Sequence, residues 1–291
     1  MIPQNNKIQE KNKINKVAVD LYERIASEKI PGLHHGYYEK GIRSYEEAIL
    51  NMNKFVGKLL DLDNIATING TVLDAGCGTG GTSLYFAELY PTISFIGITL
   101  ASKEVDLALK SQNEKKIKNT KFLVINFNNT DFSSKFFDGI FALDSIIYAE
   151  DKKKVLEELH RILKSNKKLV IISEFLIKKN LNYFIRSAYD FNYKRSAQPP
   201  LEYIENFKQF LEEVGFHEIK IQDITKNIRI SSFLMTFFSI IYFFKKKKYL
   251  KSNRNNISIN SFYYLLMIIF TQILVTLSHT SCHMAITVIK K

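Results

Sequence analysis

The alternation of strand-like and helix-like segments through the middle of the chain constrains the fold more than any other feature of the sequence. Short apolar runs are separated by longer segments whose apolar residues recur at helical spacing. The predicted strands are 71–74, 94–98, 121–125, 139–143 and 168–173, and the predicted helices are 81–90, 102–113 and 151–163. Strands that alternate with helices of this length form a mostly parallel sheet covered on both faces. We therefore predict an α/β fold with a doubly wound sheet.

Further elements are predicted on both sides of this alternating region. Two helices precede it, at 17–27 and 44–62, and the second begins with a capping box formed by Ser44 and Glu47. A helix at 202–213, a strand at 217–225 and a last strand at 283–291 follow it. The last strand would close the sheet beside the strand at 217–225. The 291 residues are enough for one such core and a cap over an active site.

Charge and cysteine content restrict the partners and the compartment. The net charge of +12 comes largely from short lysine runs, such as 152–154 and 245–248, which are typical of a solvated surface. An acidic membrane surface or a phosphate-bearing substrate is the alternative, whereas nucleic acid is not expected because no recognition motif is found. Cys77 and Cys282 lack metal-ligand spacing, so neither a disulfide framework nor a metal site is predicted. The first 30 residues resemble no secretory signal, and a cytoplasmic location is expected.

A glycine-dense turn after the first predicted strand is the candidate ligand site. Residues 72–81 read VLDAGCGTGG, a buried strand that ends in an acid and leads into a turn and a helix. In an open α/β sheet the ligand lies beyond the carboxyl ends of the strands, and glycines let the backbone approach it closely. Gly76, Gly78 and Gly81 also match G-x-G-x-x-G, but the second strand ends without the acid or arginine of a nicotinamide site. A different cofactor is therefore expected, with a purely structural turn as the alternative.

The segment 72–81 resembles the cofactor loop of class I S-adenosylmethionine-dependent methyltransferases. Residues 97–100 (GITL) are similar to the G-I-T-L-S stretch of the branch that holds tocopherol, sterol, prenyl-diphosphate and small-amine methyltransferases. Residues 34–38 (HHGYY) are similar to the H-x-G-Y segment of that branch, and the likeness continues through 137–138, 144–145, 158–164 and 210–216. The resemblance implies S-adenosylmethionine as cofactor and a Rossmann-like, seven-stranded, mostly parallel sheet whose last two strands are an antiparallel pair.

The same resemblance assigns residues to the methionine end of the cofactor. It implies that Gly76, Gly78 and Gly80, together with Cys77 between them, lie against the methionine part. It also implies that Asp74 steers the cationic amino end. A helix-capping role is the structural alternative for Asp74.

The ribose and the adenine are assigned less directly. Thr99 and Leu100 would lie beside the ribose, and Glu104 stands where the branch often has Gln. A carboxylate still accepts hydrogen bonds from ribose hydroxyls. Asn126, followed by Phe127, stands where the acid that contacts adenine is usual, and its side-chain oxygen can accept from the adenine amino group. Surface positions without a ligand are the alternative for Glu104 and Asn126.

Candidates for the acceptor side come from two separate regions. Asp144 at the end of the fourth predicted strand, Tyr148 one turn later and His35 in the N-terminal segment are the candidate catalytic residues. A capping or loop role is the alternative for Asp144, and a structural loop role is the alternative for His35. Tyr148 is expected to be protonated at pH 7 and to orient an acceptor. Tyr37 is a candidate to flank the sulfonium by a cation–π contact. His283 is expected to be structural, because nothing in the sequence ties it to the site.

The stretch between the last two predicted strands is the main peculiarity of the chain. It contains the apolar segments 230–244 and 257–277, the second uncharged over 21 residues. A single membrane span is excluded because both flanking strands belong to one sheet. The segments form either a helical cap over an apolar acceptor pocket, which we favour, or a hairpin that dips into a bilayer. The predicted division is an N-terminal helical lid (1–62), a cofactor-binding core (63–229), the apolar insertion (230–282) and the last core strand (283–291).

An apolar cap favours a hydrophobic small-molecule acceptor. We expect an isoprenoid, prenyl diphosphate, quinol or sterol-like lipid, methylated at carbon or oxygen. A diphosphate would need cations, for which Arg186, Lys194 and Arg195 are candidates unless they form a solvated helix face. The alternatives are N-methylation of a small amine and a methyltransferase-like protein that binds without turnover. Peripheral membrane contact is a further alternative, and the sequence makes no prediction of the oligomeric state.

Overall fold

The computed structural model describes residues 34–177, 183–195, 199–234 and 280–291. The predicted helix at 17–27 and nearly all of the insertion at 230–282 lie outside these residues. Within them, no helix is long and apolar enough to cross a membrane. The two ends of the insertion are connected to elements of the same sheet, as the fold prediction required.

Seven strands form one sheet with the order β3-β2-β1-β4-β5-β7-β6. They span Thr71–Ala75 (β1), Ser94–Thr99 (β2), Thr120–Val124 (β3), Phe137–Leu143 (β4), Leu163–Leu176 (β5), Phe216–Asp223 (β6) and Ser281–Lys290 (β7). Strands β1 to β5 are parallel to one another, and β7 runs antiparallel between β5 and β6. The predicted doubly wound sheet with a C-terminal antiparallel pair is confirmed.

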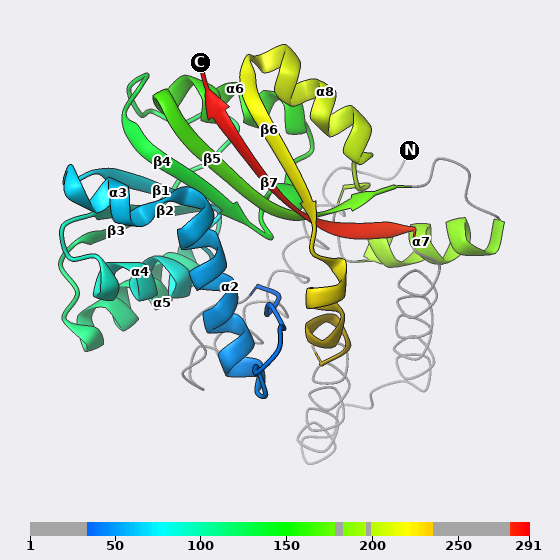
Figure 1. Cartoon of the computed structure of the whole chain (residues 1–291), viewed down its shortest axis with the longest axis horizontal. Coiled ribbons are helices and arrows are strands. Elements are labelled where there is room, and N and C mark those ends of the chain that lie inside the picture. The colour runs from blue at the N-terminus through cyan, green and yellow to red at the C-terminus, as the bar shows by residue number, and fades with distance from the viewer. Residues whose placement is uncertain (1–33, 178–182, 196–198, 235–279) are drawn as a thin grey trace, which may run out of the picture.

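Helices cover both faces of the sheet (Figure 1). They span Tyr45–Leu60 (α2), Leu62–Thr67 (α3), Gly81–Leu89 (α4), Ser102–Lys115 (α5), Lys152–Ile162 (α6), Tyr183–Arg195 (α7) and Ile204–Val214 (α8), with a 3₁₀ turn at Ile146–Tyr148 (η1) and further helical residues at 225–234. Helices α2 and α4 pack on one face of the central strands, and α6 and α8 pack on the other. Side chains alternate along a strand, so successive residues of β1 pack on opposite faces of the sheet. Val72 packs on the face covered by α2 and α4, and Leu73 packs on the face covered by α6 and α8.

Two local predictions illustrate where the sequence was sufficient and where it was not. Helix α2 has the predicted capping box, in which Ser44 Oγ accepts from the Glu47 backbone at 3.1 Å and the Glu47 carboxylate accepts from the Ser44 backbone at 3.1 Å. Strand β5, predicted at 168–173, begins earlier, at Leu163. Residues 164–168 are all polar, so the hydrophobic pattern of the sequence does not reveal this part of the strand.

The order of the strands reverses between β1 and β4, which makes this the topological switch point of the sheet. The chain moves from β1 to β2 and β3 in one direction and returns to β4 on the other side of β1. The turns that follow β1 and β4 therefore meet at the carboxyl edge of the sheet, where open α/β sheets bind ligands. They are in contact: a Cβ on Gly76 would lie only 2.2 Å from Cβ of Ser145, and the Ser145 hydroxyl donates to the Ala75 carbonyl at 2.5 Å.

Candidate active site

The turn after β1 is built on left-handed glycines. Gly76, Gly78 and Gly80 have φ values of 95°, 51° and 78°. Gly80 directly precedes α4, and a Cβ there would lie 2.6 Å from the ring of Phe122. At Gly78 nothing lies within 4 Å of the Cβ position, so the backbone faces open space. Of the three glycines, Gly78 is therefore the one whose backbone a ligand can approach.

Asp74 lies in β1 just before this turn and is 2% exposed. Its carboxylate accepts a hydrogen bond from the Ser83 hydroxyl of α4 at 2.7 Å. Burial raises the pKa of Asp74 to about 7, and the single bond from Ser83 only partly opposes this shift. A carboxyl group in this condition is stabilised by a cation, because an opposite charge favours ionisation. A ligand with a cationic amino group would supply one.

The end of β2 carries the next group of predicted residues. The Thr99 hydroxyl donates to Glu104 Oε2 at 2.5 Å, and burial raises the pKa of Glu104. Leu100 is 67% exposed, so its side chain makes little contact with the rest of the described protein. Cys77 packs against β2, since a Cβ on Gly97 would lie 2.9 Å from its sulfur. The structure thus brings Thr99 and Glu104 together at the edge of the sheet, beside the glycine turn.

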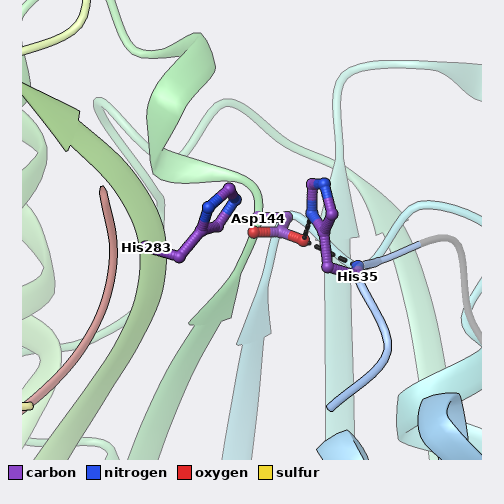
Figure 2. Close-up of side chains that lie close together, drawn as sticks. All are labelled: His35, Asp144 and His283. Atoms are coloured by element: carbon purple, nitrogen blue, oxygen red, sulfur yellow. Dashed lines mark hydrogen bonds and ion pairs between the residues drawn. The ribbon is translucent and has the colours of Figure 1, made fainter. Parts of the chain in front are cut away.

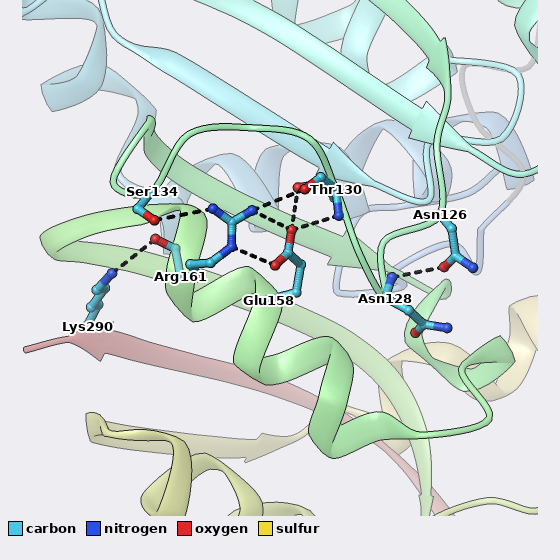
Figure 3. Close-up of polar contacts among 7 residues, drawn as sticks. All are labelled: Asn126, Asn128, Thr130, Ser134, Glu158, Arg161 and Lys290. Carbon is cyan, nitrogen blue, oxygen red and sulfur yellow. Dashed lines mark hydrogen bonds and ion pairs between the residues drawn. The ribbon is translucent and has the colours of Figure 1, made fainter.

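The turn after β3 is held in place by α6 (Figure 3). Glu158 of α6 accepts from the Thr130 backbone at 2.7 Å and is paired with Arg161 at 2.7 Å. At the start of the turn, the exposed Asn126 accepts from the Asn128 backbone at 2.9 Å. Phe127 packs on the core between the sheet and α6. The oxygen of Asn126 keeps a second lone pair, which is free to accept from an amino group of a ligand.

Three side chains from distant parts of the chain meet beyond the carboxyl ends of β4 and β5 (Figure 2). We call His35, Asp144 and His283 the His–Asp–His cluster. Asp144 Oδ2 accepts from the His35 backbone at 2.9 Å and contacts Nδ1 of the same residue at 2.7 Å. The rings of His35 and His283 lie 4.6 Å apart, edge to face. Asp144 adopts a left-handed φ of 51°, and its neighbour Ser145 touches the glycine turn.

Burial and charge act in opposite directions on this cluster. Burial opposes ionisation of Asp144, but the charge and hydrogen bonds of His35 outweigh it and hold the pKa of Asp144 well below its usual range. Burial likewise opposes protonation of His35, yet Asp144 raises the pKa of His35 overall. Burial, aided by His35, lowers the pKa of His283. Asp144 and His35 therefore stabilise each other's charged forms, whereas the surroundings of His283 favour its neutral form.

Two further predicted residues, Tyr148 and Tyr37, are not members of the cluster. Tyr148 ends the 3₁₀ turn after Asp144 and is 52% exposed. Tyr37 is buried, and its ring stacks on Phe55 with centroids 4.6 Å apart. One face of the Tyr37 ring is therefore taken by packing against α2.

The sequence analysis did not place His283 near the candidate site, whereas the structure brings it beside His35 and Asp144. It lies near the start of β7, where it pairs in register with Glu174 near the end of β5. An antiparallel strand begins at the edge where its parallel neighbours end, so the first residues of β7 lie at the carboxyl edge with Asp144. The expected antiparallel direction of the last strand was the signal that could have identified His283.

Comparison with known sequences identifies the family. Residues 67–215 match the model of the family described as methyltransferase domain. The chain is 26% identical to O-methyltransferase rstn1 of Aspergillus nomiae, over 70% of this chain and 89% of that protein. It is 24% identical to O-methyltransferase resE of Aspergillus sclerotiorum, over 72% and 78%. A phosphoethanolamine N-methyltransferase of Triticum aestivum is 29% identical over 53% of this chain and 29% of its own length.

Solved structures share the fold. A putative sarcosine dimethylglycine methyltransferase from Galdieria sulphuraria matches with a TM-score of 0.75 and 14% identity, over 94% of this chain and 98% of that chain. The [4+2]-cyclase SpnF matches at 0.69 and 17%, over 91% and 90%. Geranyl diphosphate C-methyltransferase from Streptomyces coelicolor A3(2), solved with Mg²⁺, geranyl diphosphate and S-adenosyl-L-homocysteine, matches at 0.66 and 14%, over 89% and 91%.

Proposed function

Since the chain belongs to the methyltransferase domain family and is an S-adenosylmethionine-dependent methyltransferase, we propose that it methylates a hydroxyl oxygen of a hydrophobic, isoprenoid-like small molecule. The observation that carries the choice of a hydroxyl is the His–Asp–His cluster beside the glycine turn. A hydroxyl must lose its proton when its oxygen is methylated, so it benefits from a base beside it. A tertiary amine has no proton on its nitrogen, and an alkene carbon loses a proton only after it has attacked the methyl group.

The residues around the glycine turn fit the cofactor. When bound, S-adenosylmethionine supplies an electrophilic methyl group on a sulfonium. The open space at Gly78 would admit the methionine part, and the buried carboxyl of Asp74 would pair with its cationic amino group. Glu104 would accept from the ribose hydroxyls, and Asn126 would accept from the adenine amino group.

The acceptor then lies on the side of the cofactor that faces the cluster. Ser145 packs on Gly76, so its neighbour Asp144 is adjacent to the part of the loop assigned to the methionine end. The cluster would orient the acceptor hydroxyl, and an imidazole of the cluster would accept its proton. The acceptor oxygen would gain the methyl group that the bound cofactor supplies, and S-adenosylhomocysteine would be the leaving group. Most of the rate comes from positioning and from exclusion of water.

Two further observations support a hydrophobic acceptor. The insertion between β6 and β7 is apolar over 230–244 and 257–277. Its described beginning carries Ile230 and Phe233, which are both exposed and would meet an apolar ligand without loss of polar contacts. The similarity to two fungal proteins named O-methyltransferase supports oxygen as the atom methylated.

The proposal is tested by methyl transfer from labelled S-adenosylmethionine to a panel of acceptors. The panel contains a prenylated phenol, a quinol, a sterol, geranyl diphosphate, phosphoethanolamine and sarcosine. We expect transfer to the oxygen of one of the hydrophobic hydroxyl compounds. Transfer confined to the amines, or to a carbon of geranyl diphosphate, would contradict the proposal.

Asp144→Asn is the variant that links transfer to the cluster. Asn tolerates the left-handed φ of 51° at this position, so the backbone is retained while the carboxylate is lost. We expect transfer to fall by about 100-fold, within the range of general acid–base effects, with unchanged cofactor binding. Asp131→Asn, which removes an exposed acid, is the matched control and leaves both unchanged.

A further inference from the structure

We propose that the His–Asp–His cluster binds a divalent metal ion of the zinc type, although the sequence predicted no metal site. Its ligand atoms all lie within 4.8 Å of one another, and they come from three separate elements. His35 belongs to the segment before α2, Asp144 to the turn after β4 and His283 to β7. The inference concerns the acceptor side of the site and is independent of which acceptor is methylated.

Oδ1 of Asp144 and the ring of His283 offer ligand atoms that are not used in the hydrogen bonds between His35 and Asp144. Both contacts from His35 go to Oδ2 of Asp144. Within the described ranges, no group donates a hydrogen bond to Oδ1 of Asp144 or binds a ring nitrogen of His283. Figure 2 shows the Asp144 carboxylate between the two imidazoles, with its second oxygen on the side of His283. The side chains of His35 and Asp144 are 23% and 18% exposed, so a ligand from solvent can reach the unused carboxylate oxygen.

The distances describe the metal-free form of such a site. Zinc–nitrogen and zinc–oxygen bonds of about 2.0–2.1 Å place the ligand atoms of a tetrahedral ion about 3.3 Å apart. His35 Nδ1 and Asp144 Oδ2, at 2.7 Å, are closer than this because they form a hydrogen bond. An ion would replace the proton shared by this pair, and rotation of the His283 ring would bring its nitrogen into the shell. The backbone bond from His35 to Oδ2 would hold the carboxylate in place throughout.

The surrounding charges favour a cation. Glu174 pairs in register with His283 across β5 and β7, so the two side chains project from the same face of the sheet. Asp144, Glu174 and Asp223 all act on His283 as negative charges. In the described part of the chain, the charges that act on Asp144 come from His35 and His283 when these imidazoles are protonated, and both are candidate metal ligands. A divalent ion would therefore enter a region of excess negative charge.

The ligand set selects the class of ion. Two imidazoles and one carboxylate suit zinc and similar borderline ions better than magnesium or calcium, which prefer oxygen ligands. Three protein ligands leave one position open for water or a substrate oxygen, as in catalytic zinc sites. A hydroxyl bound in that position would lose its proton more readily, because the ion stabilises the oxyanion.

Calorimetric titration of the chelator-treated full-length protein with Zn²⁺ tests the proposal, without cofactor or acceptor present. We expect one ion per chain, confirmed by metal analysis after gel filtration. Zinc affinity is expected to fall by more than about 100-fold in His283→Gln and in Asp144→Asn, because even partners outside the coordination shell are worth about 10- to 100-fold. His217→Gln, on the neighbouring strand β6, is the matched histidine control and keeps wild-type affinity.

Cobalt(II) identifies the ligands, since the chain also contains two cysteines. Co²⁺ in the stripped protein should give visible d–d bands without a thiolate-to-cobalt charge-transfer band. Thermal unfolding and S-adenosylmethionine titration establish that each variant is folded. Absence of stoichiometric zinc, equal affinity in His283→Gln or a thiolate band would overturn the proposal. These outcomes concern metal binding alone, so any of them would leave the proposed O-methylation intact.

Discussion

Asp74 is the residue whose environment makes the clearest prediction about cofactor binding. Burial raises its pKa to about 7, so without a ligand it is largely protonated at pH 6. The ionised form attracts the amino group of the cofactor, so binding tightens as the pH rises and releases a proton from Asp74 below pH 7. A single linked proton predicts about fivefold tighter binding at pH 7 than at pH 6. Calorimetry in buffers of different ionisation enthalpy measures both the affinity and the proton released.

Asp74→Asn provides the control, because its amide cannot ionise. We expect weaker binding with no pH dependence between pH 5.5 and 7. The range must stop below about pH 7.7, where free α-amino groups begin to lose their proton. Equal pH dependence in the wild type and in Asp74→Asn would show that another group is responsible.

At the scale of single elements, α6 determines the position of the turn after β3. Glu158 accepts both donors of Thr130, and Arg161 also donates to the Thr130 carbonyl at 3.2 Å. These bonds hold the pKa of Glu158 at about 2 despite its burial. Because the pKa of Glu158 is lower in the folded protein than in the unfolded chain, its carboxylate stabilises the folded state. This stabilisation is complete above about pH 4.5 and is lost as the pH falls towards 2.

Glu158→Gln should therefore destabilise the protein at neutral pH and weaken its acid dependence. The variant places an amide N–H donor beside the N–H donors of Arg161. We expect the free energy of unfolding to fall by about 1.5–3 kcal/mol, as for the loss of hydrogen bonds to charged groups. Urea unfolding at pH 7 and pH 4 measures this loss. Glu157→Gln, an exposed acid on the same helix, should change stability by less than about 0.5 kcal/mol. Comparable losses in the two variants would contradict the role assigned to Glu158.

Across the whole molecule, periodicity and motifs predicted the sheet well because each depends on local sequence. The strand VLDA, the glycine turn and the helix after it are contiguous, so the position of the first βα unit follows directly from residues 72–81. The same is true of the Ser44–Glu47 capping box. The early start of β5 was missed because residues 164–167 are polar and lie in an irregular part of the strand, between the pairs Leu163–Phe137 and Lys168–Gly139.

The acceptor side could be predicted only in part, because its residues are far apart in sequence. His35 and Asp144 are separated by 109 residues and meet through a side-chain contact that no local pattern encodes. His283 joins them only because β7 inserts between β5 and β6. A residue on a strand whose place in the sheet depends on all preceding elements cannot be assigned to a site from its own neighbourhood.

The two halves of the sheet are joined by the pairing of β1 with β4, and the turns that follow these strands are in contact beside that pairing. Gly76 tests the contribution of this contact. Gly76→Ala would place a Cβ 2.2 Å from Ser145 at a φ of 95°, forcing the two turns apart. Backbone strain and overpacking together are expected to cost about 2–4 kcal/mol in urea unfolding. Gly41→Ala is the matched control, since its φ is 101° but nothing lies within 4 Å of the new Cβ. The difference between the two variants isolates the packing of the turns. If both lost equal stability, strain alone would explain the effect, and the Gly76–Ser145 contact would contribute nothing to holding the halves together.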